Sequence, residues 1–270
     1  MTSESGHRYH RPERLDDALA LLRECAAPLL VAGGQHVVPD VESACGSWED
    51  VIDLSALDVL RGIHVEGESI VIGAGETHHA IGSNVDLRRR APALADLAMQ
   101  IGDPQVRERG TIGGSLAVND PYGDYGAVLI ALDAVVRTDS RQVNAEAWIS
   151  SGVHPREIIV SVSFQRPSRA VYVKFRQPAA GYALVGLFLA ETNQGVRAAI
   201  VGAADTPFRV ARLEAVLNAR LSASAVPKGL VSIDALVSDI HATAEYRAAL
   251  IDVAAKRAVQ KIEITRRIDI

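Results

Sequence analysis

A Gly-Gly pair follows an apolar run twice in the first half of this sequence. The first pair lies in VAGGQHVVPD, from Val31 to Asp40, and the second in RGTIGGSLAVNDPYGD, from Arg109 to Asp124. Glycine is favoured where the backbone adopts dihedral angles that side chains disfavour, or where another group approaches the backbone closely. Any fold of this chain therefore needs two tight bends or close backbone contacts next to buried segments.

The two Gly-Gly segments could bind phosphate. A loop whose successive backbone N–H groups point inward binds an anion, and two such loops could bind the diphosphate bridge of one nucleotide. Side chains that can donate hydrogen bonds flank both pairs, namely Gln35 and His36 at the first and Thr111 and Ser115 at the second. Neither segment has the spacing of a G-x-G-x-x-G fingerprint or of a P-loop. A tight turn without a ligand also explains a single Gly-Gly pair, so spacing alone leaves both interpretations open.

The composition argues against several functional classes. With a net charge of −5, four Phe and two Trp, the chain lacks the basic stripe and the stacking surface of nucleic-acid-binding proteins. No apolar run is long enough to span a bilayer, and the initial segment MTSESGHRYHRPER has no signal-like core, so we expect a cytoplasmic protein. Cys25 and Cys45 are too few for a disulfide framework and too isolated in sequence for a metal or iron–sulfur site. We therefore expect no bound metal.

The first part of the chain predicts a small parallel sheet. Apolar residues between Pro12 and Ala26 recur on one helical face, and short apolar runs at 29–32 and 51–54 are typical of buried strands. The distance between these two strands leaves room for a helical crossover, which favours parallel pairing.

From about residue 57 the pattern changes to antiparallel pairing. The segments 62–65 and 70–73 flank a Glu-Gly-Glu turn, and helices are predicted to begin at Thr77 and Pro92. Beyond the second Gly-Gly pair, the pattern predicts a helix at 125–132 and strands at 134–137 and 157–162.

The last third predicts a sheet followed by helices. The polar, proline-containing segment 165–168 is typical of a domain boundary. Three strands are predicted at 171–175, 182–190 and 196–202, and Thr206-Pro207 is predicted to begin the helices that continue to the end.

These segments resemble the FAD-binding medium subunit of the molybdenum hydroxylases, the family of xanthine dehydrogenase and aerobic carbon monoxide dehydrogenase. The paired signature of that family is matched by Ala32-Gly33-Gly34-Gln35-His36 and by Thr111-Ile112-Gly113-Gly114-Ser115, followed by Asp120-Pro121 and Asp124. Further matches are Tyr9-His10-Arg11-Pro12, Gly73-Ala74-Gly75-Glu76-Thr77, Tyr172-Val173-Lys174-Phe175-Arg176 and Glu245-Tyr246-Arg247. The resemblance therefore extends over nearly the whole chain.

The resemblance implies an α+β fold with a two-part FAD-binding domain of the PCMH type. A small parallel α/β subdomain at residues 1–56 would be followed by a larger mixed α+β subdomain at 57–166. A C-terminal domain at 167–270 would combine three antiparallel strands with a helix bundle. The bound cofactor would be FAD.

The resemblance also implies a set of cofactor-binding residues. Backbone N–H groups of both Gly-Gly segments would bind the diphosphate, and Asp124 would be an exposed carboxylate that accepts a hydrogen bond from a ribose or ribityl hydroxyl. Tyr182 would cover one face of the flavin ring, and Thr77 with His78 would line the pocket. The full set is Ala32, Gly33, Gly34, Gln35, His36, Thr77, His78, Thr111, Ile112, Gly113, Gly114, Ser115, Asp120, Asp124 and Tyr182. The adjacent His78 and His79 are also compatible with a solvated turn.

Four positions in or near these motifs depart from the family pattern. His36 stands where many relatives have serine, Ser115 and Val118 stand where asparagine is common, and Gly181 stands where an aspartate often precedes the tyrosine. A phosphate site made by backbone N–H groups would tolerate the change at position 36, although histidine is bulkier and titrates.

The chain shows no catalytic triad, paired carboxylates or redox cysteines, so we expect the bound cofactor to supply the chemistry. The resemblance implies an electron-transfer subunit without catalytic residues. A large partner subunit would carry a molybdenum-pterin cofactor, a small one would carry two [2Fe-2S] clusters, and FAD would pass electrons to an external acceptor. The assembly would be a dimer of heterotrimers. Two alternatives stay open: a self-contained flavin oxidase of the PCMH type, and an assembly subunit without flavin.

Overall fold

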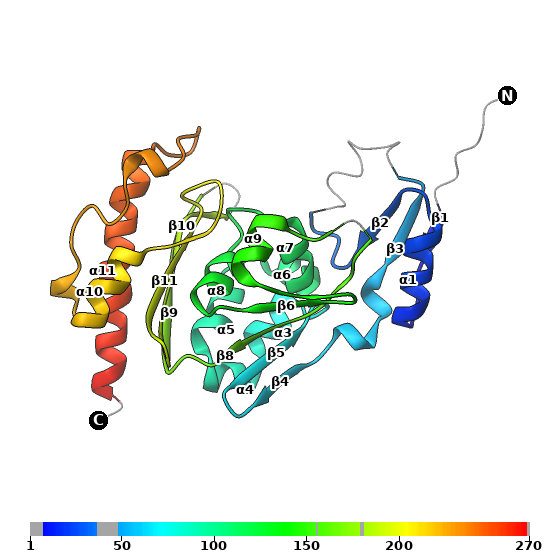
Figure 1. The fold of residues 1–270 in the computed structure, drawn as a ribbon, viewed down its shortest axis with the longest axis horizontal. Helices are drawn as coiled ribbons and strands as arrows, with labels where there is room; N and C mark the ends of the chain where they lie inside the picture. Colours follow the sequence, from blue (N-terminus) through cyan, green and yellow to red (C-terminus); the bar gives the residue numbers. More distant parts are fainter. Residues whose placement is uncertain (1–7, 37–47, 155, 179–180, 269–270) are drawn as a thin grey trace.

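Three sheets, each built from a separate part of the chain, follow one another along the long axis of the molecule (Figure 1). The computed structural model describes residues 8–36, 48–154, 156–178 and 181–268. The N-terminal sheet lies at one end, the C-terminal sheet and its helices lie at the other, and the largest unit lies between them (Figure 1). The order of these units confirms the fold class expected from the sequence.

The N-terminal sheet is parallel, with strand order β1-β3-β2. Its strands are β1 (Arg8–His10), β2 (Pro28–Val31) and β3 (Asp50–Asp53), and α1 (Leu15–Glu24) connects β1 to β2. Ala18 and Leu22 of α1 are buried together with Ile52 of β3, because residues four apart share one helical face. The helical crossover expected between β2 and β3 falls largely on residues 37–47, outside the described residues.

The central sheet is antiparallel, with strand order β4-β5-β8-β6-β7. Its strands are β4 (Ile63–Glu66), β5 (Ser69–Gly73), β6 (Val135–Thr138), β7 (Gln142–Asn144) and β8 (Ile159–Gln165). Its helices are α3 (His78–Ser83), α4 (Val85–Arg90), α5 (Pro92–Ala98), α6 (Pro104–Arg109), α7 (Ile112–Val118), α8 (Tyr125–Ala131) and α9 (Ala145–Ser151). The short 3₁₀ turns η1 (Leu54–Ala56) and η2 (Asp58–Leu60) connect this unit to the N-terminal sheet.

The C-terminal sheet is buried on both faces. Its strands β9 (Arg169–Arg176), β10 (Ala183–Thr192), β11 (Gly195–Val201) and β12 (Phe208–Arg209) are antiparallel. Along β10, Val185, Leu187 and Leu189 pack toward the C-terminal helices, whereas Phe188 and Ala190 join the core of the central unit. This alternation explains the nearly continuous apolar run of the strand, since side chains on a strand point to alternate faces.

The C-terminal helices cover the outer face of this sheet. They are α10 (Ala211–Ala219) and α11 (Ala244–Ile268), with the 3₁₀ turns η3 (Ala223–Ala225) and η4 (Ile233–Ala235) between them (Figure 1). Among the described residues, every helix is too short or too polar to span a bilayer.

The sequence-based helix start at Thr206-Pro207 was wrong. Phe208 and Arg209 extend the sheet instead, because they pair with Ile200 and Ala199 at the free edge of β11. Helix α10 begins at Ala211, where Glu214 accepts hydrogen bonds from the Arg209 guanidinium and from the Ala198 N–H. Pairing with the edge strand therefore delays the helix by about one turn.

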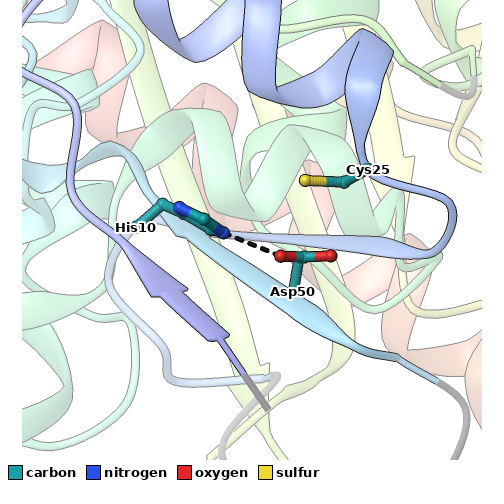
Figure 2. Close-up of side chains that lie close together, drawn as sticks. All are labelled: His10, Cys25 and Asp50. Carbon is teal, nitrogen blue, oxygen red and sulfur yellow. Dashed lines mark hydrogen bonds and ion pairs between the residues drawn. The ribbon is translucent and has the colours of Figure 1, made fainter. Parts of the chain in front are cut away.

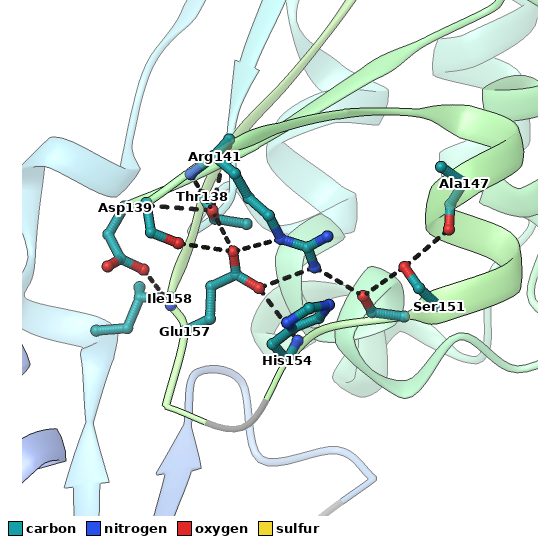
Figure 3. Close-up of polar contacts among 10 residues, drawn as sticks. Thr138, Asp139, Arg141, Ala147, Ser151, His154, Glu157 and Ile158 are labelled. Carbon is teal, nitrogen blue, oxygen red and sulfur yellow. Dashed lines mark hydrogen bonds and ion pairs between the residues drawn. The ribbon is translucent and has the colours of Figure 1, made fainter.

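A buried carboxylate connects the β6–β7 hairpin to the segment before β8. The carboxylate of Glu157 accepts hydrogen bonds from Arg141 Nε at 2.8 Å, Arg141 Nη2 at 3.0 Å, the Thr138 hydroxyl at 2.6 Å and the His154 N–H at 3.1 Å (Figure 3). Burial by itself would raise the pKa of Glu157, but these donors outweigh it and lower the pKa to about 2.

Glu157→Gln is expected to destabilise the protein by about 2 kcal/mol at pH 7, because the amide cannot replace the bidentate pair with Arg141. The low pKa of Glu157 stabilises the native protein above about pH 4.5, and this contribution is lost as the pH falls toward about 2. Urea unfolding at several pH values should show that the stability gap between wild type and variant narrows over that window. A gap that stays constant with pH would contradict this role.

Candidate functional site

The first Gly-Gly pair lies where two loops touch backbone to backbone. A Cβ atom on Gly33 would lie only 2.0 Å from the carbonyl oxygen of Arg109 and 2.9 Å from Cα of Gly110. Gly34 adopts φ +73°, a left-handed conformation that favours glycine. The first pair is therefore required both for close approach and for a bend, as the sequence suggested.

The loop that follows β2 presents a row of available hydrogen-bond donors. Within the described part of the chain, the backbone N–H groups of Gly33, Gly34, Gln35 and His36 have no protein acceptor. The Gln35 side chain turns back to donate to the Gly33 carbonyl at 3.3 Å. Four consecutive free N–H groups can surround an anion.

The second Gly-Gly pair differs, because its N–H groups are already bonded. At the start of α7, the backbone N–H of Ile112 donates to the carbonyl oxygen of Glu76 at 3.0 Å, and that of Gly113 donates to the carbonyl oxygen of Ala74 at 2.8 Å. The N–H of Gly114 donates to the hydroxyl oxygen of Thr111 at 3.1 Å. The Ser115 N–H donates to the carbonyl of Thr111. Of Thr111, Gly113, Gly114 and Ser115, which the resemblance named for the second phosphate contact, the last three have backbone N–H groups that already bond within the protein.

The two glycines of this second pair serve different purposes. A Cβ on Gly113 would lie 2.6 Å from Cβ of Ala74, so Gly113 allows α7 to pack against the end of β5. A Cβ on Gly114 would meet only the Thr111 hydroxyl, at 3.1 Å, and Gly114 faces an open cavity. The second pair therefore supports packing on one side and lines a site on the other.

A cavity of about 380 Å³ lies where the three units meet. Its walls come from the loop after β2, from α6 and α7, from the loop before α8 and from the residues just before β10. The sequence-predicted residues that line it are Ala32, Gly33, Gly34, Gln35, His36, His78, Thr111, Gly114, Ser115, Asp120, Asp124 and Tyr182. The fold thus brings together most of the residues that the family resemblance singled out, from segments up to about 150 positions apart.

Three predicted residues lie outside this cavity. Thr77 caps α3 by accepting a hydrogen bond from the Ala80 N–H, and it lines a neighbouring cavity of about 220 Å³. Ile112 is buried, and Gly113 lines a further cavity that shares Gly114 and Ala117 with the first one. The sequence analysis missed the apolar wall formed by Ile101 and Val106.

Asp124 is not the exposed carboxylate that the sequence suggested. It is only 5% exposed, it accepts hydrogen bonds from the Tyr172 hydroxyl and from Lys174 Nζ, and the Lys174 nitrogen lies at 2.8 Å. Burial raises the pKa of Asp124, while Lys174 and Tyr172 act in the opposite direction. A lysine within an apolar strand was the sequence signal that could have revealed this buried partner.

His78 is buried rather than part of a solvated turn. Its Nδ1 lies 3.1 Å from the Tyr125 hydroxyl oxygen. Burial, helped by the nearby His36 and Arg107, lowers the pKa of His78 to about 4, so the ring is neutral at pH 7. The adjacent His79 is exposed, and its Nδ1 lies 3.1 Å from a carboxylate oxygen of Glu108.

His36 and Tyr182 meet across the cavity. Nε2 of His36 lies 3.2 Å from the Tyr182 hydroxyl oxygen, which joins the loop after β2 to the C-terminal sheet. Tyr182 is 39% exposed, so its ring is a cavity wall rather than part of the core. Gly181 adopts φ +75°, a backbone conformation that explains glycine at this position.

A second polar cluster lies in the N-terminal unit, away from the cavity. Asp50 is buried, and its carboxylate lies 2.7 Å from His10 Nε2 (Figure 2). Arg8 Nη2 lies 2.8 Å from the other carboxylate oxygen, and these two partners lower the pKa of Asp50 to about 2. Cys25 is not isolated, since the possible ligand atoms of His10, Cys25 and Asp50 lie within 4.8 Å of one another. Both carboxylate oxygens of Asp50 are already bonded, so we interpret the cluster as a contact that holds β1 against β3.

Comparisons with known proteins show to which family the chain belongs. Residues 3–166 match the family described as the FAD binding domain in molybdopterin dehydrogenase. The chain is 31% identical to the carbon monoxide dehydrogenase medium chain of Afipia carboxidovorans, over 94% of this chain and 95% of that protein. It is also 31% identical to the nicotine 6-hydroxylase medium subunit of Paenarthrobacter nicotinovorans, over 93% of this chain and 95% of that subunit.

Solved structures show the same fold. A carbon monoxide dehydrogenase chain from Hydrogenophaga pseudoflava superposes with a TM-score of 0.81 and 28% identity, covering 94% of this chain and 96% of that one. The match therefore includes the C-terminal sheet and helices as well as the FAD-binding unit. This chain belongs to the family of FAD-binding subunits of the molybdenum hydroxylases.

Proposed function

We propose that this chain is the electron-transfer subunit of a molybdenum hydroxylase complex, with FAD bound in the cavity between its three units. The observation that supports this most directly is that one cavity is lined both by four consecutive residues whose backbone N–H groups have no acceptor among the described residues and by Tyr182. Free N–H groups suit a diphosphate, and an aromatic ring suits the face of a flavin.

The chain's own residues would bind and orient the cofactor. Gly33, Gly34, Gln35 and His36 would donate backbone hydrogen bonds to the diphosphate, and the side chains of Thr111 and Ser115 would supply further hydroxyl groups at the facing wall. Tyr182 would lie against the ring system. Asp124, held by Lys174, would remain able to accept a hydrogen bond from a polyol hydroxyl, since a carboxylate can accept several.

The reaction would be shared among several chains. When bound, FAD supplies electron transfer between one-electron donors and an external acceptor. Substrate would be hydroxylated at a molybdenum-pterin centre on a large subunit, and electrons would arrive through two [2Fe-2S] clusters on a small subunit. This chain would hold the flavin at the surface where those partners meet it, within a dimer of heterotrimers. The neutral His78 adds no charge to the buried side of the site at pH 7.

The experiment is to purify the full chain from cells that also express its partner chains. We expect stoichiometric FAD in the absorption spectrum, and molybdenum and iron in the chains that copurify. Flavin in a protein that oxidises a substrate without molybdenum or iron would favour a self-contained oxidase. A colourless protein to which added FAD does not bind would overturn the proposal and favour an assembly role.

A further inference from the structure

The cavity has very little positive charge for a site that accepts a diphosphate. Among the described residues that line it, there is no lysine and no arginine, and two carboxylates, Asp120 and Asp124, face it. Only His36 and His78 could carry a positive charge there. Backbone N–H groups bind an anion through partial charges alone, whereas a charged donor makes a stronger hydrogen bond.

His78 is poorly suited to supply that charge. It is buried, its Nδ1 lies beside the Tyr125 hydroxyl, and burial keeps the ring neutral at pH 7. His36 is exposed and stands at the end of the row of free N–H groups. Its ring already reaches toward the cavity, where Nε2 meets the Tyr182 hydroxyl at 3.2 Å.

We propose that His36 is a further phosphate-binding residue, whose protonated imidazole donates a hydrogen bond to the diphosphate of the bound nucleotide. This inference rests on the proposed function and adds to that function a dependence of nucleotide affinity on pH. Binding of a doubly charged diphosphate favours the protonated ring, so the added affinity is present at low pH and is lost as the pH rises. Histidine is the side chain whose charge changes between about pH 5 and 8.

The charged groups around His36 are consistent with this role. Lys174 already compensates Asp124, whereas Asp120 accepts a hydrogen bond from the Tyr122 N–H. Of the two carboxylates that line the cavity, Asp120 is therefore the one for which no ion pair is found among the described residues. Tyr182 and His78 are the other titratable groups that face the ring. Arg107 lies close to His78, but its guanidinium donates to the carbonyl oxygens of Ile101 and Gly102.

Two arginines line the neighbouring cavity and are the alternative source of positive charge for binding the diphosphate. The Arg61 guanidinium donates to the carbonyl oxygens of Gly75 and Ser55, at 3.3 and 3.2 Å. Arg109 lines the same cavity. Arginine stays charged at every physiological pH, so a contribution from Arg109 would strengthen binding without making it pH-dependent.

The test is a titration of the full flavin-free chain with FAD, ADP-ribose and riboflavin at about pH 5.5 and 8.5, which bracket histidine titration. ADP-ribose carries the diphosphate without the flavin ring, and riboflavin carries the ring without phosphate. A charged donor makes a stronger hydrogen bond to a phosphate than a neutral one, so we expect FAD and ADP-ribose to bind about tenfold more weakly at the higher pH. Riboflavin should bind equally at both.

The decisive variant is His36→Gln, which keeps a polar side chain but cannot be protonated. It should bind FAD and ADP-ribose with the same affinity at both pH values, close to that of the wild type at the higher pH. His64→Gln, an exposed histidine on β4, is the matched control and should behave as the wild type. Arg109→Gln should retain the pH dependence.

The inference is overturned if wild-type binding does not change with pH, if His36→Gln retains the change, or if His36→Gln weakens binding equally at both pH values. In each of these cases FAD still binds, so the proposed function stands. If the wild type binds neither FAD nor ADP-ribose at any pH, the proposed function itself fails.

Discussion

Gly33→Ala is expected to yield protein that no longer retains flavin on purification. The new Cβ would overlap the carbonyl of Arg109 and the backbone of Gly110, and no flexible side chain is present that could move away. Such overpacking costs about 1–3 kcal/mol. The overlap is relieved if the two loops move apart, which displaces the backbone N–H groups proposed to bind FAD. We therefore expect a loss of about 10- to 100-fold in FAD affinity, measured by titration of the flavin-free chain.

Gly67→Ala is the matched control for this experiment. Gly67 has a positive φ, +59°, and a Cβ there would have no neighbour within 4 Å, so alanine at this position adds no overlap. The substitution should lower stability slightly through backbone strain and leave flavin binding unchanged. Full flavin occupancy in Gly33→Ala with wild-type affinity would mean that the contact between the loops does not shape the site.

Lys174→Met is expected to give the largest loss of stability, about 3–5 kcal/mol at pH 7, because it leaves the buried carboxylate of Asp124 without its cation. Both side chains are almost completely buried, so water cannot replace the lost partner. Urea unfolding of the flavin-free chain measures this loss. Without Lys174, the pKa of Asp124 rises further above its unfolded value, so the deficit should shrink as the pH falls toward about 4.

A double variant separates the ion pair from simple packing. Asp124→Asn combined with Lys174→Met removes both charges and should recover part of the stability that Lys174→Met loses, as a positive coupling in the double-mutant cycle. Arg14→Met is the control, because Arg14 pairs with Asp16 on the surface and should change stability by less than about 1 kcal/mol. If Asp124→Asn recovers nothing, the loss reflects packing rather than the unpaired carboxylate.

Much of the fold follows from local patterns in the sequence. The strands predicted at 62–65 and 70–73 form a hairpin in which Ile63 pairs with Ile72, and the helix predicted at 125–132 is α8. The strand predicted at 182–190 is β10. In these segments the pattern of apolar residues fits only one type of element, so local preference and tertiary packing agree. The helix start at Thr206-Pro207 failed because an open sheet edge, which no local pattern reveals, pairs with Phe208.

The candidate site could be located from the sequence but not understood from it. The Gly-Gly pairs marked the two loops, and most of the predicted residues do line one cavity. The sequence could not distinguish the free N–H groups of the first loop from those of the second, which bond to Ala74 and Glu76 about 40 positions away. Nor could it place Lys174 beside Asp124, or His10 and Asp50 beside Cys25.

The sequence by itself determined most of the central helices and strands and where the backbone must bend, because helix and strand periodicity and the special conformations of glycine are local properties. The tertiary structure alone decided which polar groups are left available to a ligand. Hydrogen-bond satisfaction and burial depend on partners that are distant along the chain. Their arrangement encloses Asp124 and His78 and, among the described residues, leaves the backbone N–H groups of Gly33 to His36 without an acceptor.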